Sequence, residues 1–138
     1  MLVSIEDNQD WFEKIKDRLP DNVRYNLITD KAEYAKAIAR YQNLFDVIII
    51  DGSHRYECAS HALTRLRDDG LIILDNSDRM DRTSELLRAA DLIEADMSGF
   101  GPINGYTWTT SFYFRRSVIL KSAHSRQPLS GTGALESY

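Results

Sequence analysis

The sequence is poor in cysteine, has no excess of basic residues and contains no long apolar run, and each scarcity excludes a class of protein. The single cysteine, Cys58, excludes an internal disulfide framework and a Cys-x-x-Cys zinc or redox site, which suits a reducing cytosol. No apolar run approaches the length that spans a bilayer, and the amino end lacks a basic region followed by a long apolar segment. We therefore expect a cytoplasmic protein with no membrane partner.

Charge and size narrow the class further. Lys and Arg number 17 against 21 Asp and Glu, so the formal net charge is −4 and nucleic acid is not favoured as a partner. The 138 residues suffice for one domain with its own core. A content of 43% hydrophobic and 28% charged residues is typical of a soluble globular protein.

Short apolar stretches alternate with amphipathic ones along the chain. The pattern predicts strands at 1–5, 23–28, 45–50, 71–75, 91–97 and 109–116, helices at 10–19, 55–67 and 83–90, and one more helix that begins after Thr29 and Asp30 and carries Tyr34, Ile38 and Tyr41. A turn is expected at 69–70 and a glycine-rich loop at 99–106. This order predicts an α/β fold with a mostly parallel sheet and right-handed crossovers. Beyond 116 the periodicity is lost, so we expect a domain at 1–116 and a loosely ordered tail at 117–138.

The stretch FDVIIIDGSH (45–54) places a carboxylate, Asp51, directly after a strand that is apolar on both faces. Two other predicted strands also end in polar residues, namely Glu6 with Asp7 and Asp75 with Asn76. A carboxylate in such a place often caps the next helix or meets solvent. Ligands bind at the carboxyl ends of parallel strands, however, and three such ends on one edge favour a binding site there.

Three segments resemble the class I S-adenosylmethionine-dependent methyltransferases, from the second strand of that family onward. LVSIEDNQDWFEKIKDRL (2–19) resembles their second strand and helix. FDVIIIDGSHRYECASHALTRLRDDGLIILDN (45–76) resembles the fourth strand, helix and fifth strand of the small-molecule O-methyltransferase-like members. MSGFGPINGYTWTTSFYFRR (97–116) is similar to their last antiparallel pair. The resemblance implies a Rossmann-like, mostly parallel sheet that ends in an antiparallel strand pair.

The same resemblance implies that S-adenosylmethionine is the cofactor. Glu6 stands where the family holds the ribose hydroxyls, which one carboxylate can accept together, and Asp7 follows it. NLITD (26–30) resembles the segment that lines the adenine, so Thr29 and Asp30 are expected near that base.

The resemblance also implies roles at the ends of the two central strands. Asp51, Asp75 and Asn76 match the positions that hold a divalent metal in catechol- and caffeoyl-type O-methyltransferases, and their oxygens suit Mg²⁺. Two other roles stay open: Asp51 as an electrostatic partner of the positive cofactor, and Asp75 with Asn76 as a shaped turn. His54 either takes the proton from an attacking hydroxyl or forms a hydrogen-bonded start to the next helix.

The resemblance departs from the family at the amino end. The family's glycine-rich loop lies between its first strand and first helix, whereas this sequence matches from the second strand. In the family, the missing strand lies between those matched here by 1–5 and 45–51. We therefore expect an N-terminally truncated sheet, for which three alternatives stay open. The two strands pair directly, or another chain of a homo-oligomer covers their edges, or a missing N-terminal segment covers them. The missing segment is the favoured alternative.

Three functions follow from these observations. The first is a methyltransferase that uses S-adenosylmethionine and acts on an oxygen of a small-molecule acceptor, with the involvement of Mg²⁺ left open. The second is a non-catalytic remnant or interaction module that keeps the sheet and lacks the cofactor loop. The third is another kind of nucleotide-binding α/β domain, in which Glu6 holds the ribose of a dinucleotide.

Overall fold

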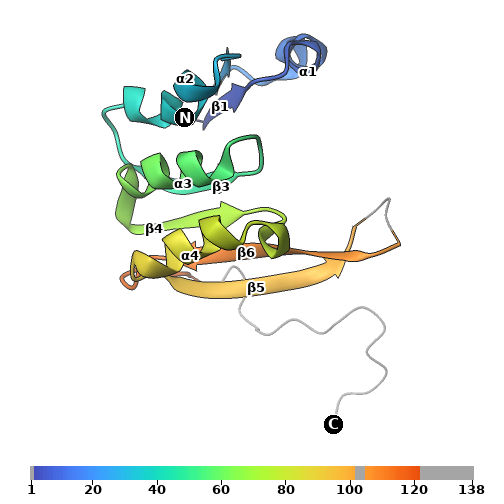
Figure 1. Ribbon diagram of the computed structural model, residues 1–138. Helices are drawn as coiled ribbons and strands as arrows, with labels where there is room; N and C mark the ends of the chain where they lie inside the picture. Colours follow the sequence, from blue (N-terminus) through green and yellow to red (C-terminus); the bar gives the residue numbers. More distant parts are fainter. Residues whose placement is uncertain (1, 102–104, 122–138) are drawn as a thin grey trace.

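The computed structural model describes residues 2–101 and 105–121, which form a mixed α/β fold (Figure 1). The strands are β1 (Leu2–Glu6), β2 (Val23–Leu27), β3 (Phe45–Ile50), β4 (Leu66–Leu74), β5 (Ile93–Phe100) and β6 (Thr107–Phe114). The helices are α1 (Gln9–Ile15), α2 (Lys31–Lys36), α3 (Arg55–Leu63) and α4 (Asp81–Ala89). Three short 3₁₀ turns complete the description: η1 (Lys16–Arg18), η2 (Ala37–Arg40) and η3 (Ser77–Arg79).

The strands form two separate sheets. β1 and β2 pair in parallel, while the second sheet has the order β3-β4-β6-β5, in which β3 and β4 are parallel and β6 runs antiparallel to both of its neighbours. This arrangement confirms the predicted α/β fold with its antiparallel strands at the carboxyl end. Within the described residues β1 and β3 share no ladder, so direct pairing, one of the three alternatives for these two strands, is not what the structure has.

The hydrophobic core lies between the four-stranded sheet and helices α3 and α4. Its fully buried large side chains are Ile72, Leu74, Leu87 and Tyr113, and Ile48 and Ile50 of β3 join them. The buried residues of β3 alternate with exposed ones because successive side chains of a strand point to opposite faces. Full burial of each large apolar side chain contributes about 1.5–3 kcal/mol, so this half of the molecule carries most of the stability.

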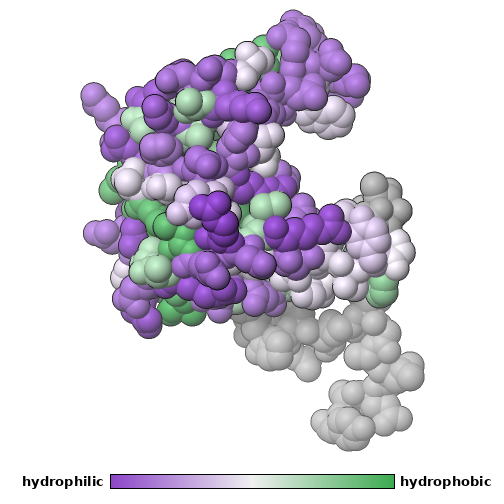
Figure 2. All heavy atoms as spheres, in the orientation of Figure 1, coloured by the Kyte–Doolittle hydropathy of each residue, from purple (hydrophilic) through white to green (hydrophobic). Residues whose placement is uncertain are grey.

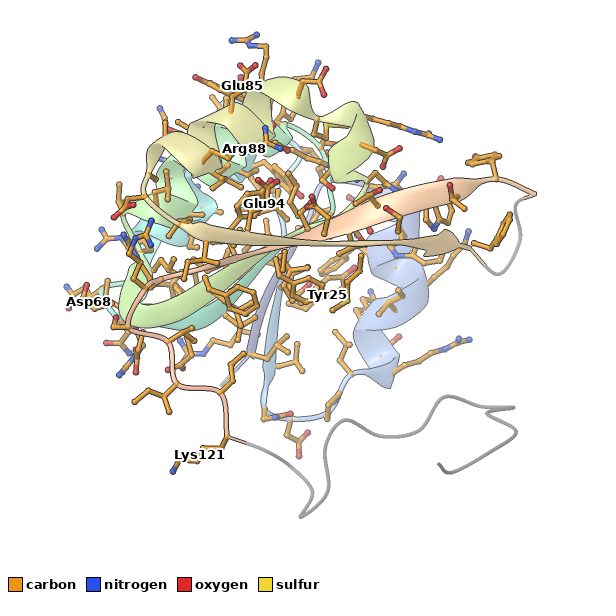
Figure 3. All side chains as sticks on the ribbon, turned by 90° about the horizontal axis from the view of Figure 1, so that it is seen from below. Tyr25, Asp68, Glu85, Arg88, Glu94 and Lys121 are labelled. Carbon is orange, nitrogen blue, oxygen red and sulfur yellow. The ribbon has the colours of Figure 1, made fainter. Side chains whose placement is uncertain are left out.

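Helices cover the two faces of the sheets unequally. Helices α2, α3 and α4 form a layer on one face, with α3 touching both of the others, whereas α1 lies on the opposite side of the strands (Figure 3). The handedness of the crossovers explains this split. The steps from β1 to β2 and from β2 toward β3 run in opposite directions across the fold, so right-handed connections place α1 and α2 on opposite faces.

The predicted end of helix 55–67 and the predicted turn at 69–70 are both wrong. Helix α3 ends at Leu63, and β4 begins at Leu66, which pairs with Phe45. Gly70 therefore lies inside a strand. A Cβ atom at this position would come within 3.0 Å of the Asp46 carbonyl oxygen and 3.1 Å of the Phe45 carbonyl oxygen, so glycine lets β4 approach the backbone of β3.

Smaller differences concern other element ends. Helices predicted at 10–19 and after Asp30 each close in a 3₁₀ turn, and β5 begins two residues later than expected, after Asp91 turns the chain with a φ of 57°. Gly99 and Phe100, expected in a loop, belong to β5, while residues 102–104 of that predicted loop lie outside the described residues. Residues 117–121 hold no helix or strand, and the rest of the predicted tail, 122–138, also lies outside the described residues.

Candidate functional site

A groove of about 850 Å³ separates the two sheets. Residues of β1, β3, α2 and η2 line it, and the residues that follow β1 and β3, namely Asp7 and 51–53, lie at its carboxyl end. Figure 2 shows the molecular surface hollowed on the side between α1 and the β5–β6 hairpin. The carboxyl ends of parallel strands are where α/β folds bind their ligands, so this groove is the candidate site.

Glu6 lies at the carboxyl end of β1 and lines the groove. Its Oε1 accepts the backbone N–H groups of Asp7, at 3.1 Å, and Asn8, at 2.9 Å. Its Oε2 has only a long 3.5 Å contact with the hydroxyl of Tyr25. The first two hydrogen bonds orient the carboxylate and leave the second oxygen able to accept further donors, as two ribose hydroxyls would require.

Three more of the residues predicted to hold the cofactor divide between the groove and the helix beside it. Asp7 lines the groove. Thr29 and Asp30 are exposed and are not among the residues that line it. Oδ1 of Asp30 accepts the backbone N–H of Glu33 at 2.9 Å, so Asp30 is the N-cap of α2. Their predicted contact with the adenine stays a prediction.

Arg55 occupies the space between the predicted metal ligands. Its Nη2 donates to the Asp51 carbonyl oxygen at 2.8 Å, and lies 3.4 Å from both Asp51 Oδ1 and Asn76 Oδ1. Its Nη1 donates to the Asp75 carbonyl oxygen, and its Nε to that of Gly52 at 2.9 Å. The Arg55 side chain is only 12% exposed, so a nearly buried cation joins the carboxyl ends of β3 and β4.

The fit of Mg²⁺ to this cluster is poor. Asp51, Asp75 and Asn76 do come together through Arg55, but the guanidinium already supplies positive charge to two of them. Oδ1 of Asp75 also accepts the hydroxyl of Thr110 at 2.6 Å. A divalent ion beside a buried guanidinium would meet like-charge repulsion. Among the residues that the structure describes, no group of three or more His, Cys, Asp and Glu side chains is placed to hold a metal.

The charge of Asp51 is only partly balanced by Arg55. Partial burial, followed by the hydrogen bond and negative charge of Asp75, raises the pKa of the Asp51 carboxyl, while Arg55 opposes this shift. The carboxylate therefore keeps a capacity for a further cationic or hydrogen-bonding partner. A sulfonium cofactor is one such partner.

His54 and Asn76 adopt left-handed backbone conformations where β3 and β4 turn into the next elements, with φ values of 51° and 49°. The His54 side chain makes no capping hydrogen bond to α3, although its carbonyl oxygen accepts the N–H of Cys58 at 2.9 Å. Its ring stands edge-on to that of Tyr34, with centroids 6.5 Å apart. The imidazole is thus half-buried and available for another partner, which suits a general base.

Tyr34 and Arg55 are site residues that sequence reasoning missed. The Tyr34 ring lies over Gly52, where any Cβ atom would collide with its hydroxyl, and burial raises the pKa of that hydroxyl to about 12. Sequence reasoning had treated Tyr34 only as an apolar helix position. A signal did exist for Arg55, because a basic residue in the first turn of a helix opposes the helix dipole and indicates an acceptor elsewhere.

Cys58 is a packed small side chain. It packs against the core, and burial raises the pKa of its thiol to about 11. A thiol that stays protonated at neutral pH is a poor nucleophile. We therefore assign no chemistry to Cys58.

Comparison of the sequence with models of protein families and with curated proteins finds no match. Solved structures do match the fold. They include the O-methyltransferase TomG from Streptomyces achromogenes, solved in complex with SAM (16% identity, TM-score 0.68, 83% of this chain and 61% of TomG). They also include precorrin-6y C5,15-methyltransferase from Geobacter metallireducens (15% identity, TM-score 0.61, 81% of this chain and 66% of that one).

The likeness at these identities concerns the fold and not the reaction. Spermidine synthase from Thermotoga maritima matches as well, with 19% identity, a TM-score of 0.57, and coverage of 82% of this chain and 44% of that one. The chain spans less than two thirds of the length of each of these three proteins. It has the Rossmann-like fold of the class I S-adenosylmethionine-dependent methyltransferases.

Proposed function

We propose that this chain works in an S-adenosylmethionine-dependent methyltransferase that methylates an oxygen of a small molecule. The observation that carries the proposal is the groove whose carboxyl end gathers Glu6, Asp7 and Asp51. Its fold is shared with methyltransferases, among them an O-methyltransferase solved with SAM. The cofactor would supply the methyl group from its positively charged sulfonium.

Two carboxylates would bind the cofactor. Glu6, oriented by two backbone N–H groups, would accept the ribose hydroxyls through Oε2. Asp51, whose side chain is 66% exposed at the end of β3, would face the sulfonium. Opposite charges attract most strongly where water is partly excluded, so both carboxylates favour a cationic ligand over a neutral analogue.

His54 would take the proton from the acceptor hydroxyl. Its ring lies at the carboxyl end of β3, three residues after Asp51, and makes no hydrogen bond that caps the helix. Methyl transfer needs little else from the protein beyond alignment of the acceptor oxygen with the methyl group. Removal of the hydroxyl proton by an imidazole contributes about 10²–10⁴-fold in such reactions.

The proposal does not include a divalent metal. Arg55 holds Asp51 and Asn76 by the geometry described above, and its fixed positive charge takes the place at which Mg²⁺ was predicted. The predicted Mg²⁺ dependence stays a prediction that a chelator tests directly. In our proposal, EDTA leaves the activity unchanged.

The acceptor in this proposal is a small molecule and not a nucleic acid. The formal net charge of −4 opposes binding to a phosphate backbone. One solved structure with this fold is nevertheless an rRNA methylase, from Streptococcus thermophilus, so RNA is the natural competitor to include in assays. No helix in the described residues is long and apolar enough to cross a membrane. The proposed place of action is the cytoplasm.

Titration calorimetry with S-adenosylmethionine tests the proposal, on the 138-residue chain and on a chain extended by the codons upstream of Met1. Glu6→Gln should weaken binding about 10- to 100-fold, since a hydrogen bond to a charged group contributes about 1.5–3 kcal/mol. The matched control is Glu13→Gln on the exposed side of α1, which should bind normally.

Two outcomes of this titration would replace the proposal. If the extended chain binds neither S-adenosylmethionine nor its demethylated product, the alternative of a non-catalytic interaction module takes its place. If the chain binds NAD through Glu6 instead, the dinucleotide alternative is correct.

A further inference from the structure

Strand β5 forms the outer edge of the four-stranded sheet, on the side away from the groove (Figure 1). It pairs with β6 on one side, and no strand of the described residues pairs with its other side. The ladder with β6 runs from Ile93 to Phe100 without a register shift, so the free edge is eight residues long and has no bulge. A free edge of this length hydrogen-bonds readily to another strand.

The sequence of β5, IEADMSGF, contains no lysine, arginine or proline, the residues that most often block an edge strand. Seven of its eight residues are exposed. Three of these are large and apolar, namely Ile93, Met97 and Phe100, the last with 76% of its surface exposed. An edge that is both unblocked and apolar favours association with a further strand.

One face of β5 is apolar. Ile93, Ala95 and Met97 alternate along the strand, so their side chains lie on the same face of the sheet. The β6 residues directly opposite the first two are Phe114 and Phe112, which extend this apolar face across the sheet. A strand added beside β5 would cover part of Met97 if its own apolar residues lay on the same face.

The other face of β5 carries both of its charges. Glu94 accepts a hydrogen bond from Arg88 at 3.0 Å, and Asp96 accepts one from the hydroxyl of Ser111 at 2.5 Å. Figure 3 shows Arg88 and Glu94 on the side of the strand that faces α4. Both carboxylates therefore lie in the first half of β5, while the second half, residues 97–100, is uncharged.

This uneven charge makes β5 complementary to a second copy of itself in the antiparallel orientation. A two-fold axis that relates two antiparallel edges places the charged half of each strand against the uncharged half of the other. Like charges directly opposite each other would destabilise the pair, and this orientation avoids them. The axis is perpendicular to the sheet, so the apolar face of one copy continues into the apolar face of the other.

The two carboxylates also select the register of the pair. Pairs centred on residues 94 to 96 set one carboxylate opposite another, which is unfavourable. A pair centred on Met97 sets Asp96 opposite the hydroxyl of Ser98. It also sets Glu94 opposite Phe100, so every residue between these two has a partner. Pairs centred nearer the end of the strand are shorter.

We propose that this chain forms a homodimer in which β5 of one copy pairs antiparallel with β5 of the other, with Met97 on the two-fold axis. The four-stranded sheets of the two copies then form one continuous sheet. A single strand pair is a small interface, so the dimer should dissociate on dilution. The proposal is independent of the proposed reaction, because the groove lies at the opposite edge of the sheet.

Sedimentation over a range of protein concentrations tests the dimer. The parent chain should reach twice the mass of one chain as its concentration rises. Met97→Lys should remain monomeric, because two lysines would then face each other on the axis. The matched control is Ile49→Lys, since Ile49 is 66% exposed against 64% for Met97 but lies on β3 at the other edge of the sheet. Ile49→Lys should dimerise like the parent.

Two sedimentation results would overturn the proposal. One is a parent chain that stays monomeric at every concentration. The other is a dimer that Ile49→Lys abolishes and Met97→Lys leaves intact, which would place the second copy at the groove instead of at β5.

Cross-linking tests the register without a charged substitution. Cys58 is the single cysteine, so Cys58→Ala provides a background without thiols. In that background Met97→Cys should form a disulfide-linked dimer when copper phenanthroline oxidises the two thiols, because directly opposed residues lie within reach of a disulfide. The control is Ile93→Cys, whose two copies would be about 27 Å apart at about 3.4 Å per residue. Equal cross-linking at the two positions would contradict the register.

Hydrogen exchange identifies the occupant of the edge. The β5 amides that point away from β6 should exchange rapidly in dilute protein and become protected as the concentration rises. Protection of these amides in the monomer would overturn the proposal, because another segment of the same chain would then occupy the edge.

Discussion

Arg55 joins the carboxyl ends of β3 and β4 and supplies the positive charge between Asp51 and Asn76. Arg55→Met keeps most of the side-chain volume and removes that charge. We expect the variant to gain measurable affinity for Mn²⁺ or Mg²⁺, because two carboxylates and an amide then face one another without a cation. Calorimetry or Mn²⁺ electron paramagnetic resonance measures this gain.

The control for this substitution is Arg79→Met, which removes an exposed arginine that lies 3.8 Å from Asp78 and over the ring of Tyr106. It should create no metal affinity. Arg55→Met should also destabilise the fold by about 1.5–3 kcal/mol, since hydrogen bonds to a charged group are lost. Equal Mg²⁺ affinity in the parent and in Arg55→Met would show that the guanidinium does not stand in for a metal.

The ionised carboxylate of Asp51 should lower the free energy of unfolding, by an amount that depends on pH. Partial burial and the neighbouring Asp75 raise the pKa of its carboxyl in the folded chain, so the ionised form is disfavoured in the native state. The cost is present above the raised pKa and disappears as the pH falls below the ordinary value of 3.8, where folded and unfolded chains are both protonated. Asp51→Asn should therefore raise the melting temperature at pH 7 and lose this advantage near pH 3.5.

Thermal melts from pH 3.5 to 7.5 measure the difference, with Asp21→Asn in an exposed turn as the control. A fall in melting temperature for Asp51→Asn at pH 7 would mean that its contact with Arg55 outweighs the cost. In that case Asp51 is a structural residue. A raised melting temperature with weakened cofactor binding is the result expected of a functional carboxylate.

Helices and strands can be predicted from the local sequence pattern only where no contact with a distant segment determines the structure. The apolar run of β3 and the acids at three strand ends were predictable, because strand alternation and parallel-sheet geometry are visible in short windows. Leu66 was not, since it continues the helical spacing of Ala59 and Leu63 and only its pairing with Phe45 makes it a strand residue. The role of Arg55 could not be predicted for the same reason, because its hydrogen-bond partners at 75 and 76 are some twenty positions away in the sequence.

The close approach of β3 and β4 should make the stability of the fold sensitive to substitution of Gly70. Gly70→Ala places a methyl group 2.8 Å from Leu66 Cδ1 and about 3 Å from two carbonyl oxygens of β3, so the ladder must shift. We expect a loss of about 1–3 kcal/mol in the free energy of unfolding, as for other overpacked sites. Urea denaturation measures it.

Gly99 is the matched control for this substitution. It also lies in a strand, β5, but a Cβ atom there meets nothing within 4 Å. Gly99→Ala should be neutral or stabilise the chain by about 0.5–1 kcal/mol, because glycine weakens strand interiors. Equal effects at the two glycines would refute the close approach of β3 and β4.

The whole molecule consists of two units of unequal stability. All members of the main hydrophobic cluster come from the four-stranded sheet, its helices and their connections, and none comes from β1 or β2. The two sheets share no ladder within the described residues, so the hydrogen-bonded network is interrupted between them. Local unfolding is easiest where few buried apolar contacts hold a segment.

The two tryptophans allow each unit to be followed separately. Trp11 lies in α1 beside the small sheet, and Trp108 lies in β6 of the large one. Single-tryptophan variants, made by Trp108→Phe and Trp11→Phe, should unfold in urea at different midpoints, with the Trp11 signal changing first. If the Trp11 and Trp108 signals change at the same urea concentration, the packing of α2 on α3 is enough to couple the unfolding of the two units.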